Sequence, residues 1–148
     1  MTIYIGADHR GYAKKYELIQ FLQSQGYTVV DKGAHELDTD DDYPDFAFSV
    51  AEAVMQDNES KGIIICGSSL GVTVAANKVK GIIATNPRSV DEAIEDRKHH
   101  GSNVLTLSSD LEDLDTMKEI IQSWMKTPFD GGRHQRRIEK INAYENSH

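Results

Sequence analysis

Short apolar runs typical of β-strands alternate five times with longer segments of helical spacing. The central run, 62–66, is GIIIC and has no polar alternation, as expected of a strand buried on both faces. Such alternation predicts an α/β fold, a parallel sheet with helices on both faces. The expected strands cover 2–6, 27–33, 62–66, 81–85 and 103–108, and the expected helices cover 11–27, 43–56, 69–79, 89–100, 113–127 and 131–144.

Local residue choices mark several of the expected helix ends. Pro44 falls in the first turn of a helix, where its missing N–H costs little. Ser89 is placed to cap the N-terminus of the following helix, and Pro128 stops the helix that precedes it. These helix-starting and helix-terminating residues support the helix boundaries that the apolar spacing suggests.

The length and charge of the chain narrow its class. The 148 residues contain no linker, repeat or low-complexity segment, so 1–148 is expected to be one domain. A formal net charge of -8 argues against nucleic acid or an anionic membrane as partner. No apolar run approaches the roughly 20 residues of a membrane span, and the first residues lack a signal-peptide core. A cytoplasmic protein is therefore expected.

Cys66 is the only cysteine, so an intrachain disulfide is excluded. It ends the central strand and is followed by the loop residues Gly67, Ser68, Ser69 and Gly71. A buried packing residue is one interpretation. The other is a reactive thiol, because a strand, a Gly/Ser loop and a helix aim backbone N–H groups into one concavity and lower a thiol pKa. We therefore consider Cys66 a candidate base or nucleophile.

Three kinds of protein place a cysteine in such a loop. A phosphatase of the Cys-x5-Arg type needs an arginine at position 72, which is valine here, so this class is excluded. A phosphotransferase-system B domain fits the loop but would not need Asp8, His9 or a basic C-terminal helix. A proton-transfer enzyme acting beside a carbonyl needs a base, an oxyanion site and an acid, and the remaining motifs favour it.

Other polar residues also follow the expected strands and helices. Asp8 and His9 follow the first strand, either as a turn with a helix cap or as part of a site. His99 and His100 end a helix, where a cationic imidazole is favoured by the dipole. Neighbouring residues on a helix point about 100° apart, so the two histidines do not predict a metal site. The acidic loop 36–42 is expected to be solvated.

The last helix carries a basic stripe. Arg133, Arg137 and Lys140 recur at helical spacing on one face, beside a thin apolar stripe. One interpretation is an exposed, solvated basic helix. The other is a helix that lies on a partner subunit and brings cations to an anion.

Together these motifs resemble the ribose-5-phosphate isomerase B family, which also includes the galactose-6-phosphate isomerase subunits. The resemblance runs nearly end to end and rests on GADHRGY, DYPDFA, GIIICGSSLGVTVAANKVKGI, KHHGSNVL and TPFDGGRHQRRIEKI in this order. It implies a Rossmann-like three-layer sandwich with a five-stranded parallel sheet, and a C-terminal helix packed on the partner subunit of a homodimer, which can pair into tetramers. It also implies reversible aldose–ketose isomerisation of a sugar phosphate, with neither metal nor cofactor.

The resemblance assigns a role to each matching residue. Cys66 would be the base that moves a proton between C1 and C2, and Ser68 would hydrogen-bond or assist that transfer. His99, from the partner subunit, would open the sugar ring with the help of Asp8. The implied substrate-binding residues are Tyr43 at the sugar, His9, Arg133 and Arg137 at the phosphate, and Gly67, Ser69, Gly71 and His100 around the enediolate.

Three positions depart from the family pattern. Ser69 stands where a glycine is usual, and His100 stands where asparagine is common. Asp110 stands where an arginine often helps to bind phosphate, and a carboxylate there would repel a dianion. Phosphate binding would then depend on Arg133, Arg137 and His9, with Arg10, Arg88 and Arg136 as secondary candidates. The first expectation is a ribose 5-phosphate isomerase. The alternatives are an isomerase of galactose 6-phosphate or another aldose phosphate, and a sugar-phosphate-binding protein without catalysis.

Overall fold

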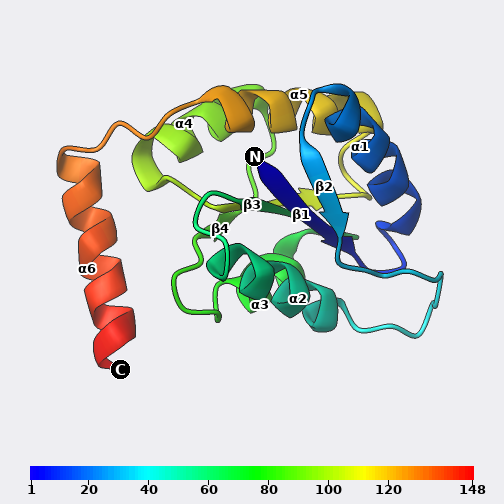
Figure 1. Ribbon diagram of the computed structural model, residues 1–148, viewed down its shortest axis with the longest axis horizontal. Coiled ribbons are helices and arrows are strands. Elements are labelled where there is room, and N and C mark those ends of the chain that lie inside the picture. The colour runs from blue at the N-terminus through cyan, green and yellow to red at the C-terminus, as the bar shows by residue number, and fades with distance from the viewer.

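The computed structural model describes all 148 residues and contains one five-stranded parallel sheet in the order β2-β1-β3-β5-β4 (Figure 1). The predicted parallel α/β fold is therefore confirmed. In register, Ile5 of β1 faces Ile63 of β3, and Ile63 faces Leu105 of β5. The strands are β1 (Thr2–Ala7), β2 (Thr28–Asp31), β3 (Lys61–Cys66), β4 (Ala84–Thr85) and β5 (Val104–Ser108).

Helices cover both faces of the sheet and form the outer two of three layers. The central strand β3 contributes to both cores, since Ile63 and Ile65 pack on one side while Ile64 and Cys66 pack on the other. One face carries α1 (Tyr12–Ser24), α4 (Val90–His100) and α5 (Leu114–Lys126), and the other carries α2 (Tyr43–Met55) and α3 (Leu70–Ala76). Burial of β3 on both faces explains its unbroken apolar sequence. No helix is both long and apolar enough to cross a membrane.

The predicted helix signals at Pro44 and Ser89 are confirmed. Pro44 lies in the first turn of α2, and the Ser89 side chain accepts a hydrogen bond of 3.1 Å from the N–H of Glu92. The predicted strand 81–85 is too long, because only Ala84 and Thr85 pair with β5. The preceding residues bond to asparagine side chains instead: Asn103 accepts from the N–H of Ile83 and donates to the carbonyl of Gly81.

A buried carboxylate joins the edge of the sheet to two helices. Asp96 of α4 is only 6% exposed, and its Oδ2 accepts from the hydroxyl of Thr85 at 2.8 Å and from the indole N–H of Trp124 at 3.2 Å. The hydroxyl of Ser102 donates to the same oxygen. This hub of hydrogen bonds connects β4, α4 and α5.

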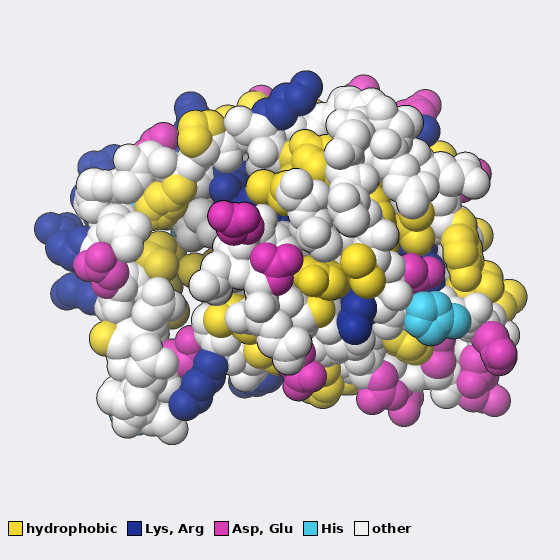
Figure 2. All heavy atoms as spheres, in the orientation of Figure 1, with side chains coloured by type: hydrophobic (Ala, Val, Ile, Leu, Met, Phe, Trp, Pro, Cys, Tyr) yellow, Lys and Arg dark blue, Asp and Glu magenta, His cyan; other side chains and the backbone are white.

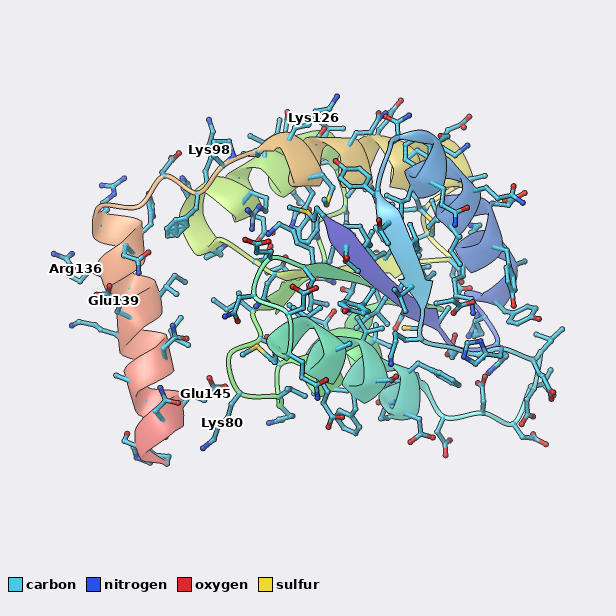
Figure 3. All side chains as sticks on the ribbon, in the orientation of Figure 1. Lys80, Lys98, Lys126, Arg136, Glu139 and Glu145 are labelled. Atoms are coloured by element: carbon cyan, nitrogen blue, oxygen red, sulfur yellow. The ribbon has the colours of Figure 1, made fainter.

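The C-terminal helix α6 (Arg133–Ser147) stands apart from the three layers (Figure 1). Of its side chains only Ile138 is buried, and Ile141 and Tyr144 are exposed. Glu145 reaches back toward the loop after α3, where it accepts a hydrogen bond of 2.9 Å from the N–H of Gly81 (Figure 3). Dark blue Lys and Arg side chains gather over α6 in Figure 2, opposite the magenta acidic side chains at the far end of the molecule.

Candidate active site

A cavity of about 380 Å³ opens at the carboxyl ends of β1 and β3, where ligands bind in parallel sheets. It brings together six of the residues expected from the sequence, and Arg10 completes its wall. The lining residues are Asp8, Arg10, Tyr43, Cys66, Gly67, Ser68 and Gly71.

Cys66 ends β3 with its thiol in the wall of the cavity and is only 5% exposed. The N–H of Ser69 donates to its sulfur at 3.2 Å. Burial raises the pKa of the Cys66 thiol, although backbone N–H groups of Val72, Ser69 and Ser68 act in the opposite direction. The expectation of a lowered pKa is therefore wrong, because desolvation of the thiolate outweighs the helix N-terminus.

Two backbone N–H groups of the loop after Cys66 donate to nearby side chains, those of Cys66 and Ser68. Besides the Ser69 N–H that faces the sulfur, the N–H of Leu70 donates to the hydroxyl of Ser68 at 3.2 Å. The direction of these two donors stabilises a thiolate at Cys66 and fixes the hydroxyl of Ser68 beside it.

Ser69 has φ +67° and ψ −12°, the left-handed conformation that favours glycine. This conformation explains why a glycine is usual at this position. The hydroxyl of Thr73 donates to the carbonyl of Ser69 at 2.6 Å, and the side chain of Ser69 lies 3.4 Å from the amide of Asn86. Its side chain is buried and does not line the cavity.

Tyr43, at the start of α2, lies directly against Gly71 at the start of α3. A Cβ atom on Gly71 would lie 2.4 Å from Cε1 of Tyr43, closer than any real contact. A side chain at position 71 would therefore displace the tyrosine from the cavity wall. Gly71 thus allows the ring of Tyr43 to approach the backbone of α3 and to form part of the cavity wall.

Asp8 directly follows β1 and is buried. Its Oδ1 accepts from the N–H groups of Arg10, at 3.0 Å, and Gly11, at 3.3 Å, in the turn that leads into α1. Burial raises the pKa of Asp8 despite these two hydrogen bonds. Asp8 therefore caps a turn and lines the cavity at the same time, so both of its expected roles are compatible.

His9 does not line the cavity and binds Asp41 of the acidic loop. Its Nδ1 lies 2.7 Å from Oδ1 of Asp41, and its backbone N–H donates to the same oxygen at 3.2 Å. The other oxygen of Asp41 is buried without a partner. The expectation that the whole acidic loop is solvated is wrong at Asp41, because this carboxylate pairs with His9. In the sequence, the only sign of this role was the position of Asp41 in the acidic loop 36–42, just before Tyr43.

Replacing Asp41 with asparagine should lower the pKa of His9. The hydrogen bond from His9 to Asp41 is the main cause that raises this pKa above its usual value. A raised pKa contributes stability that is fully present below the unfolded pKa and is lost as pH rises through the folded pKa. NMR titration of the imidazole Cε1–H measures the change. Glu36→Gln removes an exposed charge from the same loop and serves as control; an equal pKa of His9 in both variants would contradict the assignment.

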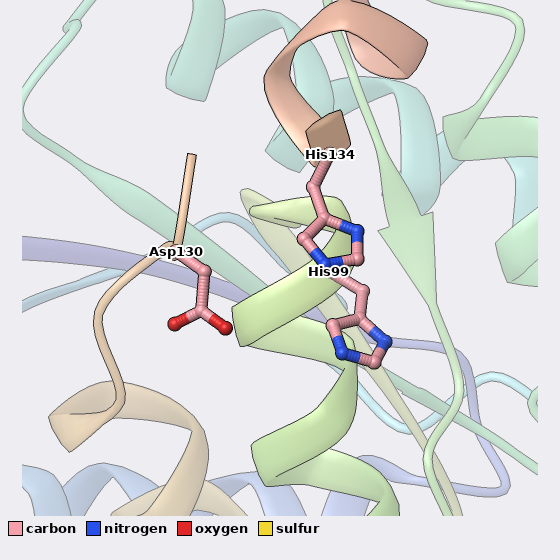
Figure 4. Close-up of side chains that lie close together, drawn as sticks. All are labelled: His99, Asp130 and His134. Atoms are coloured by element: carbon pink, nitrogen blue, oxygen red, sulfur yellow. The ribbon is translucent and has the colours of Figure 1, made fainter. Parts of the chain in front are cut away.

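The expected ring-opening histidine and phosphate-binding arginines do not line the cavity of their own chain. His99 stacks on His134 of α6 with ring centroids 4.3 Å apart, and Asp130 lies nearby (Figure 4). Partial burial lowers the pKa of His134, and the charges of neighbouring groups lower it further. One ligand atom each from His99, Asp130 and His134 lies within 4.8 Å of the other two. Arg133 and Arg137 lie on the helix that begins beside this stack.

His100 lies on a different side of α4 from His99, with the two rings at 82°. Its Nδ1 is 3.3 Å from Oδ1 of Asp96. It lines a separate cavity of about 240 Å³, whose wall also contains Asn86. The position that departs from the family pattern is therefore tied to the Asp96 hub.

Asp110, after β5, pairs with Arg10, whose Nη2 donates to its carboxylate. The carboxylate was expected to repel a phosphate, but the guanidinium compensates its charge. Arg10 was only a secondary candidate from the sequence, although it directly follows Asp8 and His9 in the same turn. That adjacency was the available sign that it reaches the site.

Comparisons with known proteins agree with this geometry. The profile of a family described as Ribose/Galactose Isomerase matches residues 3–141. The chain is 45% identical to the "Probable ribose-5-phosphate isomerase B" of Mycoplasma genitalium and 38% identical to the "Ribose-5-phosphate isomerase B" of Escherichia coli, covering 97% of this chain and 95% of each relative. The crystal structure of the Mycoplasma genitalium protein "with bound Ribulose-5-phosphate" superposes with a TM-score of 0.96, at 42% identity over 99% of this chain and 97% of that one.

Proposed function

This chain belongs to the ribose/galactose isomerase family, and from that premise we propose that it interconverts ribose 5-phosphate and ribulose 5-phosphate. The observation that carries the proposal is the whole-chain likeness to a solved isomerase that holds ribulose-5-phosphate. The proposal treats residues 1–148 as one sugar-phosphate isomerase domain. The cytoplasmic location remains a prediction.

The proposed reaction passes through a cis-enediolate with Cys66 as general base. The thiolate takes the proton from C2 of the open-chain aldose and returns it to C1, while the hydroxyl proton moves from O2 to O1. The carbonyl thus moves from C1 to C2. Ser68 assists from the same wall of the cavity, which it shares with Cys66. Because proton transfers alone complete the exchange, the proposal includes neither metal nor cofactor.

We propose that a second copy of the chain completes the site. In support, His99, Arg133 and Arg137 do not line the cavity of their own chain, and α6 leaves Ile141 and Tyr144 exposed. The resulting homodimer, which can pair into tetramers, would place a ring-opening histidine and two arginines against the neighbouring cavity. Asp8 would then assist at the ring oxygen.

The other site residues keep their expected roles in this proposal. His9 contacts the phosphate through its Nε2, because Asp41 binds its Nδ1, and Tyr43 lies over the sugar. Gly67, Ser69 and Gly71 shape the loop on which the substrate rests. His100 acts near the enediolate, with its orientation set by Asp96.

A coupled assay over pentose and hexose phosphates tests this function. The expected result is turnover of ribose 5-phosphate with the highest kcat/KM of the panel, and no turnover of unphosphorylated ribose. A preference for galactose 6-phosphate or another aldose phosphate would change the proposed substrate but keep the proposed reaction. Binding of sugar phosphates without turnover of any of them would refute catalysis.

A further inference from the structure

Arg10 is the only cationic side chain in the wall of the cavity that contains Cys66. The other lining groups are neutral, apart from the carboxyl of Asp8. A phosphate dianion that leaves water needs charged or strongly polar donors in its binding site. Within one chain, the cavity therefore offers an anion one guanidinium, that of Arg10.

Two contacts hold this guanidinium in place. Asp110 accepts a hydrogen bond from its Nη2. Gly67 lies directly beneath it, since a Cβ atom built on Gly67 would lie 2.8 Å from Nε and 2.9 Å from Cζ of Arg10. The absence of a side chain at position 67 thus lets the guanidinium lie across the loop that follows Cys66.

The pairing with Asp110 leaves Arg10 able to bind a ligand. A guanidinium has five N–H donors, and the structure engages one of them, at Asp110. The Arg10 side chain is 54% exposed and that of Asp110 is 43% exposed. Because exposed ion pairs contribute little to stability, orientation of the guanidinium explains this pair better than stabilisation of the fold.

We propose that Arg10 binds the phosphate group of the sugar phosphate and that Asp110 is a positioning residue that holds the guanidinium over Gly67. This inference rests on the proposed function, because it names a binding residue of the same site. Arg10 belongs to the same chain as Cys66. It would therefore bind the phosphate together with Arg133 and Arg137, which are expected to come from α6 of a second copy. Asp110 then supports phosphate binding through Arg10, even though its own charge opposes that of phosphate.

Arg10→Gln tests the proposal by removing the charge and keeping a polar side chain. Loss of a hydrogen bond to a charged group weakens binding by about tenfold or more. We expect KM for ribose 5-phosphate and the inhibition constant of inorganic phosphate to rise by that factor, with kcat changed less than about threefold. Arg10→Lys should recover part of the affinity. Asp110→Asn should raise both constants in the same direction by less.

Lys126→Gln is the matched control, because it removes one exposed positive charge from the end of α5, and both constants should stay at wild-type values. Unchanged constants in a folded Arg10→Gln protein would overturn the inference, as would a fall in kcat at constant KM. Isothermal titration calorimetry with inorganic phosphate separates this inference from the proposed function. If the wild type does not isomerise ribose 5-phosphate, weaker phosphate binding by Arg10→Gln still supports the inference, and equal binding overturns it.

Discussion

Replacing Cys66 with alanine is expected to lower kcat for ribose 5-phosphate by about a thousandfold or more. A general base raises the rate of proton transfer by about 10²–10⁴-fold. Cys66 is the only thiol in the cavity wall. The change removes one sulfur atom from a buried site and leaves Arg10 and Tyr43 in place. Binding of inorganic phosphate should therefore persist, which calorimetry measures beside the coupled assay.

The pH dependence of the wild type provides a second measure of the same role. Because burial raises the pKa of Cys66, most of the thiol is protonated at neutral pH. We expect kcat/KM to rise with pH from neutrality toward the thiol pKa, and alkylation by iodoacetamide to follow the same curve. Cys66 is the only cysteine, so alkylation reports on this residue alone. Near wild-type turnover by Cys66→Ala would exclude it as the base.

Replacing Asp96 with alanine is expected to lower the free energy of unfolding by about 3 kcal/mol. Each buried donor left without an acceptor costs about 1–3 kcal/mol, and Asp96 accepts from Thr85, Ser102 and Trp124. For a chain of this length the melting temperature should fall by about 10 °C. Urea unfolding followed by tryptophan fluorescence measures the change directly, since Trp124 is the only tryptophan and contacts Asp96.

Glu95→Ala is the matched control for Asp96. Glu95 is the preceding residue of the same helix, but its side chain is 68% exposed and its Oε1 lies 3.6 Å from Nδ1 of His99. Its replacement should change the free energy of unfolding by less than about 0.5 kcal/mol. Equal effects of the two substitutions would show that the buried hydrogen bonds of Asp96 contribute nothing beyond helix propensity.

The layers of the fold could be predicted because their signals are local or periodic. The apolar run 62–66 placed β3 at the centre of the sheet, and the resemblance placed Cys66 and Asp8 at one site. The strand β4 was predicted too long, because an edge strand ends where side chains such as those of Asn77 and Asn103 take over its backbone hydrogen bonds.

The contacts that the sequence did not reveal join residues far apart in the chain. Asp41 binds His9 across 32 positions, and Asp110 binds Arg10 across 100 positions. No spacing rule relates such partners. Asp41 resembled the solvated acidic residues around it, and Asp110 was expected to repel a phosphate. The pKa of Cys66 was mispredicted for a related reason, since helix position is visible in a sequence whereas the depth of burial is not.

Because α6 is separated from the sheet, the activity of the proposed enzyme should depend on the concentration of the protein itself. If His99, Arg133 and Arg137 act on the cavity of a second copy, the number of complete sites follows the association of two chains rather than the folding of one. Below the dissociation constant of the pair, activity per chain would fall in proportion to dilution while every chain remained folded. Mass action between copies would thus set the output of the enzyme as directly as the supply of its substrate.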